Sequence, residues 1–143
     1  MKFENHMTLE FPSKSTNEAF ARSAVACFAA QLDPNMEELG DIRTAVSEAV
    51  TNCIVHAYPN ELGMITIRCR ILKDHTLDIV IKDKGIGIEN LEQARRPLFS
   101  TGGSDRSGMG FTIMESFMTA FDVSSVPGKG TTIHMRRKLQ RRK

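Results

Sequence analysis

The sequence predicts an α+β fold in which helices cover one face of a mainly antiparallel sheet, a two-layer sandwich. Several short segments alternate apolar with polar residues, as half-buried strands do, and longer segments carry apolar residues at helical spacing. Two tight-turn sequences join neighbouring strands, and strands do not alternate regularly with helices as in a parallel sheet. With 143 residues and no linker or internal repeat, residues 1–143 are expected to form a single domain.

The first part of the chain is predicted to fold as one strand and two helices. Met7, Leu9 and Phe11 alternate with polar residues and indicate the strand. A helix is expected from Thr16 to Leu32, because Asp33-Pro34 would end it. The second helix is expected from Met36 to Tyr58, where one apolar stripe recurs at helical spacing: Leu39, Ile42, Val46, Ala49, Val50, Cys53, Ile54 and Ala57.

The second part is predicted to contain two hairpins separated by a third helix. Strands with alternating Ile65 to Ile71 and Leu77 to Ile81 would close around Asp74-His75. The third helix is expected after a glycine-rich loop, with a periodic stripe of Gly110, Met114, Phe117, Met118 and Phe121. Strands at residues 121–126 and 131–137 would then pair across the turn sequence Pro127-Gly128-Lys129-Gly130.

Composition favours a folded protein of the cytosol. The chain is 41% hydrophobic and 25% charged, which excludes a disordered class. Its N-terminus has no signal-peptide pattern and its apolar runs are short, so no membrane association is expected. Cys27, Cys53 and Cys69 have no metal-type spacing, and we expect all three to be buried thiols.

The net charge of +2 depends on the C-terminal end of the chain. A short basic tail is expected from about residue 136 to 143, where six of the 19 Lys and Arg residues lie. The remainder has 13 basic against 17 acidic residues, a charge of −4. A basic tail can bind nucleic acid, but no stacking aromatic residues accompany it. A solvated terminus without direct nucleic-acid binding is therefore the favoured interpretation.

Two polar patches carry the functional signal. Glu48 and Asn52 stack one turn apart on the second predicted helix, with Glu48 roughly opposite its apolar stripe and Asn52 displaced toward the edge of that stripe. Such a pair also occurs on ordinary surface helices. Asp83 follows a predicted strand directly, and Gly85 and Gly87 permit a turn or a close backbone approach. A carboxylate in that place could accept a hydrogen bond from a base amine, although an ordinary turn remains the alternative.

A third patch, Gly102-Gly103-Ser104-Asp105-Arg106-Ser107-Gly108-Met109-Gly110, brings a glycine-rich loop to the start of a predicted helix. Backbone N–H groups and the helix dipole favour anions there, which indicates phosphate binding. The chain contains no P-loop sequence, and no dinucleotide-binding fingerprint follows a strand in a βαβ unit. The three patches together predict an adenine-nucleotide site of another kind.

These motifs resemble the GHKL (Bergerat) ATP-binding fold of gyrase, MutL and sensor histidine kinases. The N box corresponds to Glu48–Asn52 and the first glycine box to Asp83-x-Gly85-x-Gly87, with Gly108-x-Gly110 and Gly130-Thr131 as the remaining motifs. Over nearly the whole chain the sequence is similar to the bacterial serine-kinase anti-sigma factors of sporulation. Further segments that carry this likeness are residues 17–22, 31–34, 97–99 and 106–115.

The resemblance implies ATP/ADP and Mg²⁺ as cofactors, with Glu48 as the catalytic carboxylate and Asn52 as the magnesium ligand. It implies nucleotide contacts at Asn52, Asp83, Gly85, Gly87, Thr101, Arg106, Ser107, Gly108, Met109, Gly110 and Thr131. Asp83 and Thr131 would lie at adenine, and the loop from about Thr101 to Gly110 would close over the phosphates. Arg106 could offset phosphate charge or form a salt bridge between this lid and a helix.

The resemblance also implies partners and a homodimer. One partner would be an RNA polymerase sigma factor, sporulation sigma factor F, which the protein inhibits. The other would be an anti-anti-sigma protein that accepts phosphate on a serine, since the chain lacks the phosphoacceptor hairpin of a sensor kinase. Arg22 matches the family's partner-contacting arginine, although a solvated helix charge explains it equally well. ATP would favour the sigma complex.

Two alternatives remain from the sequence. The lid segment, residues 100–105, is less charged than in the family, which leaves open a clamp that sequesters its partner with ATP but transfers no phosphate. Another GHKL regulatory kinase of the stress-response type is also consistent with the motifs. A nucleic-acid binder is the least favoured class.

Overall fold

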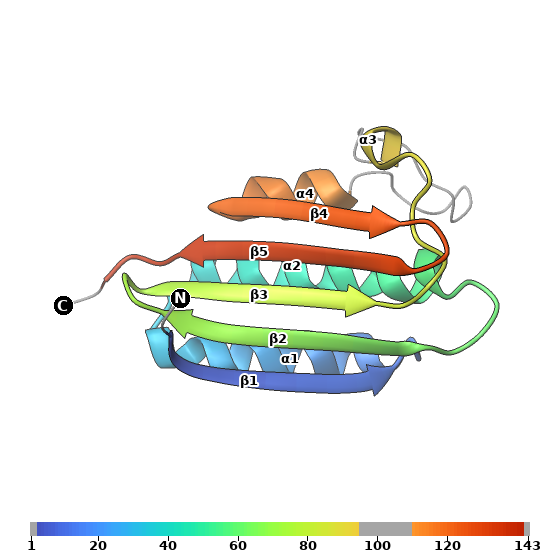
Figure 1. Cartoon of the computed structure of the whole chain (residues 1–143). Helices are drawn as coiled ribbons and strands as arrows, with labels where there is room; N and C mark the ends of the chain where they lie inside the picture. The colour runs from blue at the N-terminus through green and yellow to red at the C-terminus, as the bar shows by residue number, and fades with distance from the viewer. Residues whose placement is uncertain (1–2, 95–109, 142–143) are drawn as a thin grey trace.

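The computed structural model describes residues 3–94 and 110–141 as one layer of helices on a five-stranded sheet (Figure 1). The strands lie in the order β1-β2-β3-β5-β4, and every neighbouring pair is antiparallel. Their bounds are β1 Phe3–Pro12, β2 Met64–Leu72, β3 Thr76–Asp83, β4 Ala120–Val126 and β5 Gly130–Lys138. The predicted α+β two-layer sandwich is confirmed.

The main helices α1, α2 and α4 all lie behind the sheet in Figure 1 and cover the same face. Their bounds are α1 Asn17–Ala29, α2 Met36–Asn52 and α4 Gly110–Phe117, with a 3-10 turn η1 Ala30–Leu32, a π-helical turn η2 Cys53–Ala57 and a short α3 Leu91–Ala94. The sequence did not predict α3, and α4 ends before the predicted Phe121, which lies in β4. The short segment between α4 and β4 therefore turns the chain directly back into the sheet.

The start of α2 is fixed by a capping box. The Asn35 side chain accepts a hydrogen bond from the N–H of Glu38 at 2.7 Å, and the Glu38 carboxylate accepts one from the N–H of Asn35 at 2.9 Å. Together they satisfy two N–H groups that a helix start leaves without partners. Glu38 also accepts the N–H of Gln140 at 2.9 Å, so the same carboxylate ties the end of the chain to α2.

The end of α2 differs from the prediction. A single α-helix was expected to continue to Tyr58, but the helix widens into the π-helical turn η2 directly after Asn52. The N–H of Tyr58 bonds the carbonyl of Cys53 at 3.2 Å, five residues back. Apolar spacing cannot distinguish this turn from an α-helix, because both place residues four apart on nearly the same face. Turns of this kind are frequent at functional sites.

Both predicted hairpins are confirmed. Leu72 pairs with Thr76, so Lys73, Asp74 and His75 join β2 to β3. Asp74 and His75 have φ of 67° and 57°, positive values of the kind that tight hairpin turns use. β4 and β5 are joined through a turn in which Gly128 has φ 80° and Gly130 has φ 121°. Glycine adopts such values without the clash that a side chain would cause.

The core lies between the helices and one face of the sheet. Ile42, Val46 and Val50 of α2 are fully buried, as are alternate residues of the central strands: Ile65, Ile67, Cys69, Leu77, Ile79, Ile81, Ile133 and Met135. Apolar residues at every second position of the strands and at helical spacing on α2 therefore form one buried layer. Of the three cysteines, Cys53 and Cys69 are buried but Cys27 is exposed, so the prediction for Cys27 is wrong.

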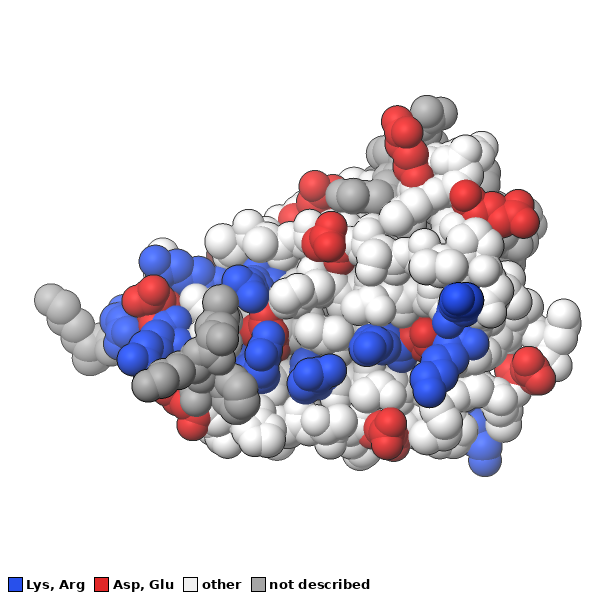
Figure 2. Space-filling view, viewed as in Figure 1, with Lys and Arg blue, Asp and Glu red and all other residues white. Residues whose placement is uncertain are grey.

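The opposite face of the sheet has no helix over it in the described parts of the chain. Figure 2 shows Lys and Arg side chains gathered along the middle of this face, where Arg68 and Lys82 are exposed. Asp78 lies among them and is fully buried. Its carboxylate accepts hydrogen bonds from Arg70 (3.0 and 3.1 Å), Arg136 (2.8 Å) and the His134 ring (2.6 Å).

The basic end of the chain is largely part of the fold. β5 continues to Lys138, and Leu139 is buried. Arg137 forms an ion pair with Asp41 of α2 at 2.9 Å, and its guanidinium also donates to the carbonyl of Phe117. The solvated tail that the sequence predicted from residue 136 therefore does not begin before Gln140, which follows the buried Leu139.

Candidate nucleotide site

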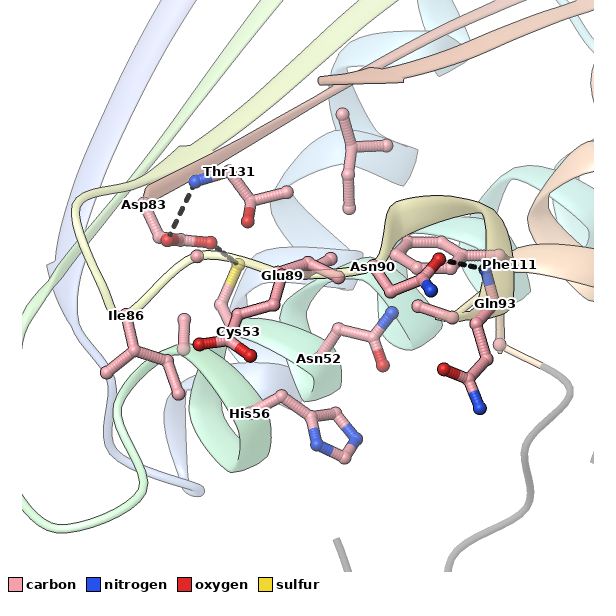
Figure 3. A pocket seen from close by; sticks show the side chains of 16 residues that line it. Asn52, Cys53, His56, Asp83, Ile86, Glu89, Asn90, Gln93, Phe111 and Thr131 are labelled. Atoms are coloured by element: carbon pink, nitrogen blue, oxygen red, sulfur yellow. Dashed lines mark hydrogen bonds between the residues drawn. The ribbon is translucent and has the colours of Figure 1, made fainter. Parts of the chain in front are cut away.

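A cavity of ≈ 460 Å³ opens where α2, η2, the end of β3 and the start of β5 meet α3 and α4 (Figure 3). This volume lies within the usual range for a small-molecule site. Its described lining combines polar side chains with an apolar floor: Asn52, Cys53, His56, Ala57, Asp83, Ile86, Gly87, Ile88, Glu89, Asn90, Gln93, Ala94, Gly110, Phe111, Thr131 and Ile133. The predicted residues Asn52, Asp83, Gly87, Gly110 and Thr131 are thus brought together around one space.

Asp83 is a buried charged residue in the wall of the cavity. It is the last residue of β3, and its side chain points to the helix layer with only 8% of the residue exposed. Its Oδ1 accepts the N–H groups of Gly85 at 2.9 Å and Thr131 at 3.2 Å, and its Oδ2 accepts the thiol of Cys53 at 3.5 Å. Two backbone donors therefore hold one oxygen, while the other has a weak thiol donor.

The donors around Asp83 are neutral, which decides its acid–base behaviour. Burial raises the pKa of the Asp83 carboxyl, and the hydrogen bonds from Gly85, Cys53 and Thr131 lower it only in part. Burial also raises the pKa of the Cys53 thiol well above its usual range, and the nearby Asp83 charge adds to this. The thiol consequently stays protonated and remains a donor to the carboxylate.

The loop after Asp83 is held between η2 and the β4–β5 turn. A Cβ on Gly85 would lie 2.2 Å from the carbonyl oxygen of Ala57, so only glycine fits there. The N–H of Ile86 donates to that carbonyl at 3.1 Å, and the carbonyl of Ile86 accepts the N–H of Gly128 at 2.7 Å. Gly87 has φ 76°. The predicted glycine box is therefore a loop that is held in place along one wall of the cavity.

Thr131 lines the cavity at the start of β5. A Cβ on the preceding Gly130 would lie 2.2 Å from the carbonyl oxygen of Asp83, so the two strands approach as closely as glycine allows. The Thr131 hydroxyl lies 2.8 Å from the Ser125 hydroxyl, which also accepts the N–H of Ile88 at 2.8 Å. This network fixes the Thr131 side chain beside Asp83, where both face the cavity.

Asn52 extends from the last residue of α2 into the cavity (Figure 3). Gly110 at the start of α4 faces it, since a Cβ there would lie 3.4 Å from the Asn52 amide. Glu48 lies one turn earlier on α2 and is half-buried, outside the residues that line the cavity. The predicted stacking of Glu48 and Asn52 along α2 therefore brings only Asn52 to the cavity wall.

Arg22 lies on α1 and is linked to α2. Its guanidinium donates to both oxygens of Glu18 at 2.9 and 3.0 Å, and Glu18 accepts the Ser47 hydroxyl at 2.8 Å. The Arg22 side chain is 36% exposed. The residue is thus neither buried nor freely solvated, and its partner Glu18 contacts the residue that precedes Glu48.

The predicted site residues and the residues that line the cavity do not coincide fully. Thr101, Arg106, Ser107, Gly108 and Met109 lie outside the described residues. Lining residues that the sequence did not assign to the site are Cys53, Ile86, Ile88, Glu89, Asn90, Gln93, Phe111 and Ile133. Glu89 and Asn90 directly follow the glycine box and Phe111 follows Gly110, so proximity to the motifs could have found these three.

Across residues 3–94 and 110–141, no three His, Cys, Asp or Glu side chains converge as a metal cluster. Asn52 is the oxygen donor that the family resemblance assigns to magnesium, and it extends into the cavity. One amide oxygen fits a hard cation that also takes phosphate oxygens, rather than a site made by protein alone.

Comparison with known proteins identifies the family. Residues 11–137 match the histidine kinase-like ATPase domain. The anti-sigma F factor of Caldanaerobacter subterraneus subsp. tengcongensis is 56% identical over 142 residues, covering 99% of each chain. This chain belongs to the anti-sigma F factor family. Other members are 54% identical in Clostridium acetobutylicum, covering 95% of each chain, and 51% identical in Bacillus licheniformis, covering 98% of this chain and 97% of that one.

Solved structures share the fold of this anti-sigma F factor family member. A Mycobacterium tuberculosis structure of RsbU and RsbW domains superposes with a TM-score of 0.72 at 16% identity, over 97% of this chain and 34% of that chain. The histidine kinase domain of an Erythrobacter litoralis blue-light activated kinase gives 0.59 at 20% identity, over 85% and 60%. The described helices include none long and apolar enough to cross a membrane.

Proposed function

We propose that this protein is an ATP-dependent anti-sigma factor that inhibits a sigma factor and phosphorylates a serine of an anti-anti-sigma protein. The observation that carries the proposal is the Asp83 carboxylate, which is buried in the cavity wall with one oxygen held by backbone N–H groups. Membership of the anti-sigma F factor family supports the sigma factor as partner. The histidine kinase-like ATPase domain supports ATP as the cofactor.

Asp83 and Thr131 would recognise the base. An ionised carboxylate only accepts hydrogen bonds, so Asp83 selects a base with an amine at the contacting edge. Among the described residues, its Oδ2 accepts a hydrogen bond from the thiol of Cys53 alone and can accept another. The apolar side chains of Ile86, Ile88, Phe111 and Ile133 line the same cavity and would pack on the faces of the ring.

Asn52 and the start of α4 would hold the phosphate end. Gly110 brings the first turn of α4 next to the Asn52 amide, and the N–H groups of a helix start favour anions. Asn52 would contribute an amide oxygen to Mg²⁺. When bound, Mg-ATP supplies the phosphoryl group and the positive charge that offsets the phosphates.

Glu48 would act on the acceptor. A carboxylate that orients the serine hydroxyl and receives its proton completes the set needed for a transfer that depends mainly on positioning. Its place one turn before Asn52, half-buried and outside the cavity lining, fits a group that meets the partner protein rather than the nucleotide.

Arg22 would anchor a partner, and the protein would act as a homodimer. Arg22 is held by Glu18 through one guanidinium nitrogen that contacts both carboxylate oxygens, so less side-chain freedom is lost when a partner binds it. Through Glu18 and Ser47 the same contact reaches α2 beside Glu48. ATP would favour the sigma complex, and transfer to the anti-anti-sigma protein would leave ADP in the cavity.

A non-catalytic clamp is the second candidate, because Glu48 does not line the cavity. The test is to incubate the chain with labelled Mg-ATP and a purified anti-anti-sigma protein, using wild type and Glu48→Gln. We expect label on the acceptor serine with wild type, a loss of transfer by at least about 100-fold in Glu48→Gln, and unchanged ATP affinity. A clamp would give no transfer even with wild type.

A further inference from the structure

Cys53 lines the cavity, but the proposed function gives its thiol no role. It is the first residue of η2, is 2% exposed, and lines the cavity beside Asp83 (Figure 3). Its thiol lies 3.5 Å from Oδ2 of Asp83. This is the oxygen that the backbone N–H groups of Gly85 and Thr131 do not hold.

The two oxygens of Asp83 are therefore fixed from opposite sides. Oδ1 is held by the loop and β5, and Oδ2 is approached by η2. A thiol is a weak donor, so it orients Oδ2 and favours its charge without using the oxygen's full capacity to accept. Cys53 directly follows α2, and its N–H still bonds the carbonyls of Ala49 and Val50, so the last turn of α2 places its side chain beside Asp83.

We propose that Cys53 is a positioning residue for base recognition. Its thiol donates to Oδ2 of Asp83, and this hydrogen bond keeps the carboxylate ionised and holds Oδ2 in place for the base. The inference rests on the proposed nucleotide site and names a residue that acts through Asp83. Because the donor favours the charged carboxylate, its removal should weaken binding most at low pH, where Asp83 begins to protonate. Other titratable groups nearby are Tyr58 at the end of η2, and His56 and Glu89 in the cavity wall.

Three substitutions separate the hydrogen bond from the volume of the side chain. Cys53→Ser keeps a hydroxyl donor, Cys53→Val keeps most of the volume without a donor, and Cys53→Ala removes both. The probe is ADP, whose dissociation constant is measured by calorimetry between about pH 5 and pH 8, a range that reaches down toward the carboxyl pKa region. Cys69→Ala is the matched control, since Cys69 is fully buried on β2 and does not line the cavity.

We expect Val and Ala to behave alike, weakening ADP binding about threefold to tenfold at the acidic end and less at the alkaline end. Ser and the Cys69→Ala control should stay within about twofold of wild type at every pH. The proposal is overturned if Val resembles wild type while Ser and Ala lose affinity equally at all pH values, because Cys53 would then act through packing alone. If wild type itself fails to bind ADP, the nucleotide site is wrong as well.

Discussion

Two buried aspartates on β3, five residues apart, have opposite surroundings. Asp78 lies on the open face, where its carboxylate contacts two guanidinium groups and an imidazole. Asp83 lies on the helix-covered face at the cavity, where its carboxylate accepts hydrogen bonds from two backbone N–H groups and a thiol. Burial raises the pKa of both carboxyls, but hydrogen bonds from His134, Arg136 and Arg70 bring that of Asp78 below its ordinary value. The pKa of Asp83 remains raised.

This difference separates a carboxylate that stabilises the fold from one that is available to a ligand. A buried charge surrounded by cations has its interactions completed inside the protein. A buried carboxylate with neutral donors is held in place, yet its charge is not compensated, so a ligand amine gains by meeting it. The same residue type on the same strand thus serves two purposes, and the donors decide which.

The largest expected effect is on ligand binding by Asp83→Asn. Its amide oxygen would turn to the N–H groups of Gly85 and Thr131, which leaves the NH₂ group facing the base amine. We expect ADP affinity to fall by about 100-fold. Calorimetric titration of both proteins measures the change, and an unchanged affinity would reject Asp83 as the base contact.

Asp78→Asn should lower the stability of the fold and leave ADP binding unchanged, the opposite of Asp83→Asn. It leaves Arg70, Arg136 and His134 without their shared carboxylate, although these side chains are 23%, 34% and 35% exposed and can be partly rehydrated. We expect a loss of about 2 kcal/mol in the free energy of unfolding and unchanged ADP affinity. Thermal unfolding provides the measurement. A variant that binds ADP poorly but unfolds at the wild-type temperature would contradict the division between the two sites.

The two carboxyls should also oppose each other in the pH dependence of stability. The folded pKa of Asp78 lies below its unfolded value, so its contribution is present above the unfolded pKa and is lost as pH falls through the folded one. The folded pKa of Asp83 lies above its unfolded value, so its contribution is present at low pH and is lost as pH rises through the folded one. Denaturant unfolding at several pH values should show that the free energy of unfolding falls less steeply toward acid pH in Asp78→Asn than in wild type. Asp83→Asn should instead raise stability at neutral pH.

The smallest expected effect is that of Thr131→Val. This substitution removes the hydroxyl next to Ser125 but keeps the backbone N–H that Asp83 accepts. We expect ADP affinity to fall only about threefold, with the pH dependence of binding unchanged. A loss as large as that of Asp83→Asn would mean that the hydroxyl, rather than the carboxylate, is the main contact with the base.

Much of this architecture could be predicted from the sequence, because local patterns carry it. Alternation along β2 and β3, the turn at Asp74-His75 and the motif residues Asn52, Asp83 and Thr131 all follow from neighbours in the chain. The π-helical turn could not be predicted, since its apolar spacing matches that of an α-helix. The contact between Cys53 and Asp83, 30 residues apart, depends on how the end of α2 packs against the end of β3, which local patterns in the sequence do not determine.

The preference between ADP and GDP shows directly whether Asp83 recognises the base. Adenine presents an amine donor where guanine presents a carbonyl acceptor, and an ionised Asp83 can only accept. Competition calorimetry should show wild type binding ADP at least about 100-fold more tightly than GDP, with the preference nearly lost in Asp83→Asn. Equal binding of the two nucleotides by wild type, or a preference that survives Asp83→Asn, would contradict the account.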